Sequence, residues 1–345
     1  MSNTWEYRYA FRVQAFEDVP PEFRNAYTNL AAREGDPVLS FFSPALQEGH
    51  VLMSRWTPPR LWVVFPNSLA LLSLDQKSDA VTSFVLRRED FLGFGYREFL
   101  LNCCFSVYPG RSEGEPIEVR FPSRAEEKYQ DLAKFFVGWA RADRPIPAQP
   151  ECAKKQNVLA GLPPKFAHLM EWHPEFGKVG EMFFQPHMVF GRRRSGEWPN
   201  LSLLLTSEAV VVLADQYRGR WSEYGVEYLY LPLTRVKLAE WVEAEGTDRG
   251  GIRVHLEGAS RHTSVCWDVF MGLKPYALRW VWVVECTLQT DGRDIGQSKD
   301  RGTQMGNAGA LKQIPGTSST VSCEPESFVS SPLRTDGRSR PSTVR

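Results

Sequence analysis

Two arginine-rich segments hold the residue types best suited to chemistry in this chain. Residues 191–199 read Gly-Arg-Arg-Arg-Ser-Gly-Glu-Trp-Pro, and residues 217–221 read Tyr-Arg-Gly-Arg-Trp. A guanidinium group binds phosphate through two parallel hydrogen bonds, and an indole ring is favoured at the interface between water and lipid. These segments predict a site for an anionic ligand or a membrane surface, formed by Arg192, Arg193, Arg194, Trp198, Arg218, Arg220 and Trp221.

A purely solvated role for both segments stays open beside this prediction. Arginines in surface loops are usually hydrated and contribute little to folding. The matching segments of the first half of the chain offer only Arg55, Trp56, Arg60 and Lys77. Lys and Arg together number 41, and so do Asp and Glu, so the overall charge gives no reason to expect nucleic acid as a partner.

No pattern typical of a metal site or a catalytic centre occurs. His168 and His173 lie about 140° apart on a helix, and His187 belongs to another element. The six cysteines include no CxxC pair and are expected as reduced thiols. The GxSxG, HExxH, Walker and GxGxxG patterns are also missing. We therefore expect no metal, no cofactor and no enzymatic activity. An enzyme built from dispersed residues stays open as an alternative to the binding functions given below.

The elements that must position these segments occur twice in the chain. Residues 19–23 (Val-Pro-Pro-Glu-Phe) return as residues 162–166 (Leu-Pro-Pro-Lys-Phe), an offset of 143 positions. Phe41-Phe42 matches Phe183-Phe184 at an offset of 142, and Asp75-Gln76 matches Asp215-Gln216 at 140. Such constant offsets indicate an internal duplication. The predicted parts are an N-terminal strand extension (1–17), a first domain (18–143), a linker (144–160), a second domain (161–289) and a disordered tail (290–345).

Each domain is predicted to begin and end with a helix. The opening helices carry apolar stripes at helical spacing, formed by Phe23, Tyr27 and Leu30 in the first domain and by Phe166, Met170 and His173 in the second. Gly35 and Gly177 supply the left-handed stops. The closing helices have stripes of Tyr129, Leu132, Phe136 and Trp139, and of Leu273, Tyr276, Trp280 and Val283.

Short antiparallel strands are predicted between these helices. They cover residues 37–43, 50–54, 60–66, 69–75, 81–87, 91–108 and 116–121, then 181–190, 200–206, 209–215, 223–231, 235–243, 252–257 and 262–269. Gly93 and Gly95 fall inside one strand, where glycine marks a bulge or a barrel corner. Loops after odd-numbered strands of a meander leave from the same end, so the two arginine-rich segments should lie side by side.

The N-terminal extension has the pattern of a half-buried strand. Residues 5–13 alternate aromatic or aliphatic side chains with mostly charged ones. Such a strand needs a partner, and we expect it to pair within the chain, at an open sheet edge of the first domain. No segment has the features of a signal peptide or the roughly 18 apolar residues needed to span a bilayer, which predicts a cytoplasmic protein.

A meander of short strands closed by one C-terminal helix resembles the pleckstrin-homology-like superfamily, in particular bacterial PH and GRAM-type domains. Residues 203–211 (Leu-Leu-Leu-Thr-Ser-Glu-Ala-Val-Val) are similar to a hairpin of these domains but lack its basic residue. The resemblance implies an α+β, mainly antiparallel fold with two tandem PH-like barrels. It also implies non-catalytic recognition of lipids, peptides or proteins. In phosphoinositide-binding PH domains the two corresponding loops form the ligand site.

We therefore predict a non-catalytic binding or adaptor protein. Its second domain would hold an anionic-ligand or membrane-surface site, and binding there would make it a peripheral membrane protein. The alternative is a protein–protein interaction scaffold, or a homo-oligomer, without lipid binding.

Overall fold

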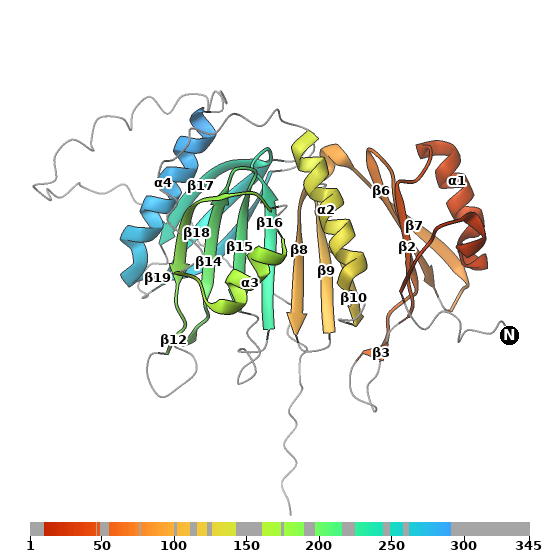
Figure 1. Cartoon of the computed structure of the whole chain (residues 1–345), viewed down its shortest axis with the longest axis horizontal. Helices are drawn as coiled ribbons and strands as arrows, with labels where there is room; N and C mark the ends of the chain where they lie inside the picture. Colours follow the sequence, from red (N-terminus) through yellow and green to blue (C-terminus); the bar gives the residue numbers. More distant parts are fainter. Residues whose placement is uncertain are drawn as a thin grey trace, which may run out of the picture.

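The chain folds as an α+β protein with mostly antiparallel sheets and few helices, as predicted (Figure 1). The fold is seen in a computed structural model, which describes residues 10–45, 47–48, 55–75, 77–99, 102–110, 116–122, 126–142, 161–173, 176–189, 197–215, 225–243, 249–257 and 262–290.

The first half begins with a helix and continues as an antiparallel sheet. A 3-10 turn at Pro21–Phe23 leads into α1 (Arg24–Glu34), which Gly35 ends with a φ of +92°, a left-handed conformation that glycine adopts without strain. The next strands pair in chain order: β2 (Leu39–Ser43), β5 (Arg60–Val64), β6 (Ser68–Asp75) and β7 (Ala80–Arg87). A two-stranded ribbon, β3 (Gln47–Glu48) with β4 (Arg55–Trp56), lies between β2 and β5 in the chain.

A second group of strands and a helix complete this half. A 3-10 turn at Arg88–Asp90 leads from β7 to β8 (Phe91–Phe99), which pairs with β9 (Asn102–Pro109), and β9 pairs with β10 (Ile117–Pro122). Residues 91–108, predicted as one strand, thus form two. The predicted bulge is confirmed, because the β8–β9 register shifts between Phe91 and Gly93. The half closes with α2 (Glu126–Ala142).

The second half repeats this order of elements. It begins with α3 (Pro164–Trp172) and β11 (Val179–Gln185), followed by a ribbon of β12 (Met188–Val189) and β13 (Glu197–Trp198). The sheet continues with β14 (Leu201–Thr206), β15 (Ala209–Asp215) and β16 (Gly225–Pro232). The last group is β17 (Val236–Glu243), β18 (Arg249–Glu257) and β19 (His262–Phe270), closed by α4 (Lys274–Thr290).

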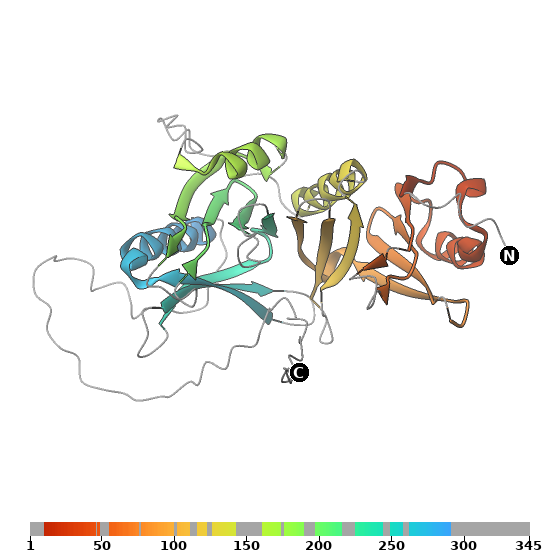
Figure 2. The same ribbon diagram turned by 90° about the horizontal axis from the view of Figure 1, so that it is seen from below.

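The two halves share one sheet. Strand β8 of the first half pairs antiparallel with β16 of the second, from Phe99 opposite Gly225 to Phe94 opposite Tyr230. This pairing makes a seven-stranded sheet in the order β10-β9-β8-β16-β15-β14-β11. Figure 2 shows α2 and α3 on one side of this sheet and strands β17 to β19 on the other.

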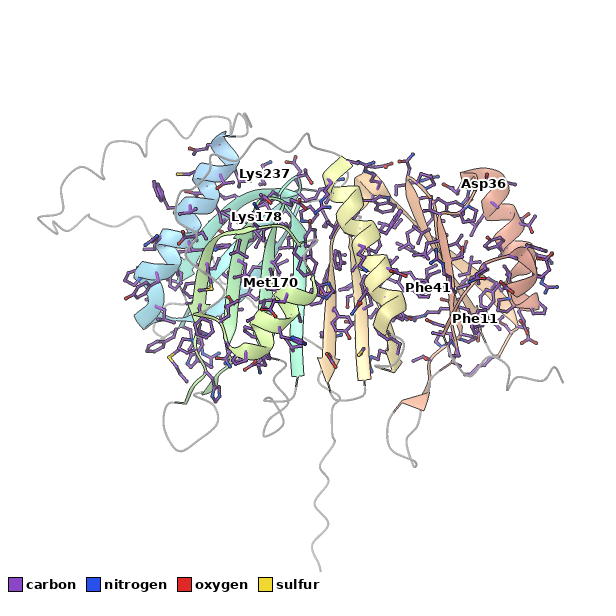
Figure 3. The ribbon with its side chains drawn as sticks, viewed as in Figure 1. Phe11, Asp36, Phe41, Met170, Lys178 and Lys237 are labelled. Carbon is purple, nitrogen blue, oxygen red and sulfur yellow. The ribbon has the colours of Figure 1, made fainter. Side chains whose placement is uncertain are left out.

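A shared apolar core lies between the seven-stranded sheet and the two helices. It runs from Phe41 in the first half to Met170 in the second, and both are labelled in Figure 3. Phe94 of β8 stacks on Tyr230 of β16 with ring centroids 5.1 Å apart, so aromatic contacts cross the junction between the halves. Burying a side chain of this size stabilises the folded state by roughly 1.5–3 kcal/mol.

Two predicted details of the fold are wrong. Among the described residues no pairing joins β7 to β8 or β16 to β17, so neither half closes into a barrel; β16 occupies the edge of β8 instead. The predicted stripe of α4 is wrong at one position: Tyr276 is 65% exposed, whereas Trp280 is buried and Leu273 and Val283 pack against the core. The buried face of α4 is formed by Ala277, Trp280, Val281, Val284 and Leu288.

The described end of the N-terminal extension pairs within the chain, as predicted. Strand β1 (Phe11–Arg12) lies on the outer edge of β2, with Phe11 opposite Phe42 and their ring centroids 5.3 Å apart. Val13 donates its amide to Ser40 O at 2.9 Å and is buried.

Candidate functional site

Most residues of the predicted anionic-ligand site lie outside the described part of the chain. Arg192, Arg193 and Arg194, like Arg218, Arg220 and Trp221, belong to residues 190–196 and 216–224. The structure does describe the strands from which these two segments leave. The first connects β12 to β13, and the second connects β15 to β16. Hereafter they are loop A (190–196) and loop B (216–224).

One side chain ties the base of the ribbon that carries loop A to the base of loop B. Asn200, at the end of the ribbon that carries loop A, accepts a 2.8 Å hydrogen bond from the His187 amide. Its Nδ2 donates to Asp215 Oδ2 at 2.7 Å, and Asp215 is the last described residue before loop B. The Asp215 amide also donates to Asn200 O at 3.0 Å. The ribbon that carries loop A and the strand that leads into loop B therefore meet at one end of the seven-stranded sheet.

Two further polar side chains, Lys165 and Gln185, fix this end of the sheet. Lys165 Nζ forms an ion pair with Asp215 Oδ1, so α3 neutralises the carboxylate at the base of loop B. Gln185, fully buried, accepts the Phe270 amide at 2.8 Å and donates to Pro199 O at 3.4 Å. These bonds hold β11, the ribbon and β19 together beneath loop A.

Trp198 is a packing residue in this structure. Its side chain is 7% exposed and packs edge-on against Phe270, with ring centroids 6.0 Å apart. The Arg249 guanidinium lies 5.2 Å from the centre of the Trp198 ring. The predicted role of Trp198 at a lipid interface needs an exposed indole, so the burial of this side chain argues against that role. Its position in β13 instead anchors the end of loop A.

The first half has no comparable pair of basic loops among its described residues. Arg60 donates to Glu118 O, and the Lys77 amide bonds Asp75 Oδ1 at 2.9 Å in the β6–β7 turn. Arg55 and Trp56 form strand β4, the counterpart of β13. The difference between the halves therefore concerns the arginines of loops A and B.

Sequence reasoning missed a half-buried cluster of charges where the halves meet. Arg97 on β8 lies opposite Glu227 on β16 and opposite Cys104 on β9. Its Nη2 bonds Glu118 Oε1 at 2.5 Å and Cys104 Sγ at 3.5 Å. Only the pairing of β8 with β16 brings Glu227 to this place, so the local pattern of neither strand could have revealed it.

The environment of this cluster shifts several pKa values. Burial raises the pKa of Glu227, and Arg97 offsets only part of that effect. Burial also raises the pKa of the Cys104 thiol and of Tyr108, whose ring lies over Gly95. Shifted groups of this kind occur at functional sites and equally in structural ion pairs. Both bonds of Arg97, to Cys104 and Glu118, lie within the first half, and its position opposite Glu227 links the cluster to the second half.

The histidines considered for metal binding do not gather with other ligands. His173, predicted as a packed helix residue, is 4% exposed and stacks on Phe176 with ring centroids 4.8 Å apart. Within the described ranges no group of three or more His, Cys, Asp or Glu side chains could hold a metal ion. In the same ranges no helix has both the length and the apolar character that crossing a membrane requires.

Comparisons with known proteins give no family for this chain: no family model and no curated protein matches it.

Proposed function

We propose that the protein is a non-catalytic binding protein whose second half holds an anionic-ligand or membrane-surface site, formed by loops A and B. The observation that carries the proposal is the bond of Asn200 to Asp215, because it brings the bases of the two loops together. The loops contain five arginines against a single glutamate, Glu223. A site of this charge would make the protein an adaptor at a membrane surface.

The physical argument rests on the sum of several weak attractions. Each Lys or Arg close to an anionic membrane contributes about 1 kcal/mol, and the contributions act together only when the charges face the same surface. The positively charged loops would face such a surface jointly. Gly191, Gly196 and Gly219 free the main chain of the loops to approach phosphate oxygens.

Vesicle sedimentation tests the proposal with the full chain. Vesicles of phosphatidylcholine alone are compared with vesicles that also contain phosphatidylserine or a phosphoinositide, and soluble inositol phosphates compete to separate a headgroup from a membrane surface. We expect binding to the anionic vesicles only. Replacing Arg192, Arg193, Arg194, Arg218 and Arg220 with Gln should abolish it and leave Tm nearly unchanged.

The matched control removes the same number of charges elsewhere. Its Gln substitutions are at Arg33, Lys77, Lys134, Lys237 and Arg279, all exposed. The control should bind anionic vesicles like the wild type. Absence of wild-type binding, or binding that survives loss of the five loop arginines, would contradict the site.

A PH-like character of each half is part of the same proposal. The repeated order of four paired strands, three paired strands and a closing helix supports it. The second candidate function is a protein-binding scaffold or homo-oligomer without lipid binding. It is favoured by the edge of β7, which within the described residues pairs only with β6 and carries no charge over residues 80–86.

A further inference from the structure

Strand β7 has a free edge within the part of the chain that the structure describes. It is the last strand of the order β1-β2-β5-β6-β7 and pairs only with β6. Ala80, Thr82, Ser83 and Phe84 are exposed, and 38% of Phe84 is accessible. Such an edge presents unpaired main-chain groups to another strand. Figure 2 shows the β6–β7 hairpin, in orange, projecting from the N-terminal half.

No feature of β7 opposes the addition of a strand. Residues 80–86 read Ala-Val-Thr-Ser-Phe-Val-Leu, without a charge, a proline or a glycine. The pairing with β6 runs through all eight residues without a register shift. Val, Thr and Phe favour extended structure. Arg87, the single charged residue of β7, lies at its end and bonds Glu34 at 3.0 Å.

The other sheet edges in the described ranges carry features that oppose pairing. Charges, prolines, bulges and short length are the usual means by which proteins protect an edge. Strand β1 has two residues, and β11 and β17 each contain a register shift. Helix α4 packs along β17. The strands of the ribbons β3–β4 and β12–β13 have two residues each. The two other edges contain charged residues or proline: Glu118, Arg120 and Pro122 in β10, and Asp268 in β19.

The counterpart of β7 in the second half already has an added strand. Cross-strand rows define the counterparts, and they run Phe41, Trp62, Leu71, Phe84 in the first half and Phe183, Leu203, Val212, Leu229 in the second. Leu229 lies opposite Gly95 of β8 and is 7% exposed. Phe84 ends its row at the free edge. The chain thus contains one example of the strand addition that β7 leaves open.

We propose that two copies of this chain associate through β7, which pairs antiparallel with β7 of the second copy across a two-fold axis. A partner strand must itself offer a run of residues without charge, proline or bulge, and residues 80–86 of β7 form such a run, with the charge of Arg87 confined to the end of the strand. Antiparallel pairing is also the sense of the β16–β8 example. A two-fold contact lets one surface serve both copies.

The contact is expected to be weak and reversible. One strand and the Phe84 side chain bury less surface than the roughly 1,200 Å² typical of stable complexes. The dimer should therefore form with rising protein concentration and dissociate on dilution. Loops A and B are not part of the contact, so the proposal does not rest on the anionic-ligand site.

Sedimentation velocity of the full chain over a wide range of concentration tests the dimer. Phe84→Lys places a charge in the middle of the contact and should leave the protein monomeric at every concentration. Tyr276→Lys is the matched control, because Tyr276 is an aromatic residue, 65% exposed, on α4. It should dimerise like the wild type, and both variants should melt like the wild type.

Hydrogen exchange of residues 80–84 gives a second measurement. Their amides should be protected at high protein concentration and exchange faster on dilution, with no such change in Phe84→Lys. A wild type that stays monomeric, or a Phe84→Lys protein that still dimerises, would overturn the proposal. Protection that does not depend on concentration would assign the edge to a segment of the same chain and overturn it as well. Phe84→Lys should still bind anionic vesicles, because loops A and B are unchanged. Failure of the dimer can therefore be told apart from failure of the anionic-ligand site.

Discussion

Glu227 on β16 lies directly opposite Arg97 on β8, in the strand pair that joins the two halves of the chain. Arg97 is bonded to Glu118 on β10, so its guanidinium lies between two carboxylates, one on each side. Opposite charges on facing positions of neighbouring strands stabilise their pairing, whereas burial penalises each charge separately. The raised pKa of Glu227 indicates that burial dominates for that carboxylate.

Glu227→Gln should raise Tm at pH 7, and the gain should shrink as the pH falls toward 4.5, the ordinary glutamate pKa. The folded protein holds the Glu227 proton above the ordinary glutamate pKa of 4.5, because burial raises its pKa. Raising the pH through that window therefore costs stability, since the folded state must release a proton that it holds more tightly than the unfolded state does. Glutamine keeps the size of the side chain without the charge.

Melting curves of wild type and Glu227→Gln across this pH range make the measurement. Glu257→Gln is the control, because Glu257 is an exposed residue at the end of β18. Its Tm should follow the wild type at each pH. A Glu227→Gln protein that melts below the wild type at pH 7 would mean that the pair with Arg97 outweighs the cost of burial.

Gly93→Ala should destabilise the junction between the halves by about 1–3 kcal/mol. A Cβ at position 93 would lie 2.5 Å from Tyr230 O, a main-chain atom of the neighbouring strand that cannot yield without disturbing the pairing. Gly138→Ala is the matched control, since nothing lies within 4 Å of its Cβ and alanine favours a helix. Urea unfolding should show a lower midpoint for Gly93→Ala and an equal or higher one for Gly138→Ala.

The sequence repeats predicted the order of elements but not every register. When Phe41 is placed with Phe183, the cross-strand rows place Leu71 with Val212 at an offset of 141. The match of Asp75 with Asp215, at 140, differs from this register by one residue, so the two sequence matches do not share one register. A slip of one residue moves a side chain to the other face of a sheet. The offset changes because connections of different length separate the strands, and a repeat pattern alone does not locate such changes.

The junction could not be predicted because its signal is divided between distant segments. The strands β8 and β16 are more than a hundred residues apart in the chain, and each is a plausible strand of its own half. Gly93 and Gly95 gave the nearest hint, since they allow the main chain of β16 and the ring of Tyr108 to approach closely. The opening helices, by contrast, depend on local spacing, and both were predicted. Gly35 ends α1 as expected, whereas α3 ends at Trp172 with His173 as its cap, so the predicted stop at Gly177 is wrong although Gly177 has a positive φ.

Trp198→Ala should lower stability by about 3–5 kcal/mol, because it empties a packed site between Phe270 and Arg249. Trp282→Ala is the matched control, since Trp282 is 57% exposed on α4 and its removal should change the unfolding free energy by less than about 0.5 kcal/mol. Chemical denaturation of the two variants makes the comparison. Equal stabilities would contradict the packing role of Trp198.

Asn200→Ala should weaken binding to anionic vesicles several-fold although it removes no charge. The substitution breaks the bonds to the His187 amide and to Asp215, so the bases of loops A and B lose their shared anchor and their arginines no longer face one surface together. Loss of these hydrogen bonds should also cost about 1–3 kcal/mol of stability, which urea unfolding measures separately.

Asn200→Asp should have a larger effect on both vesicle binding and stability, because it places a second carboxylate against Asp215. Asn67→Ala, at an exposed turn in the first half, controls for the loss of an amide side chain and should leave both properties unchanged. If Asn200→Ala binds vesicles as tightly as the wild type while its stability falls, the anchor matters for folding alone and the two loops do not act as one site.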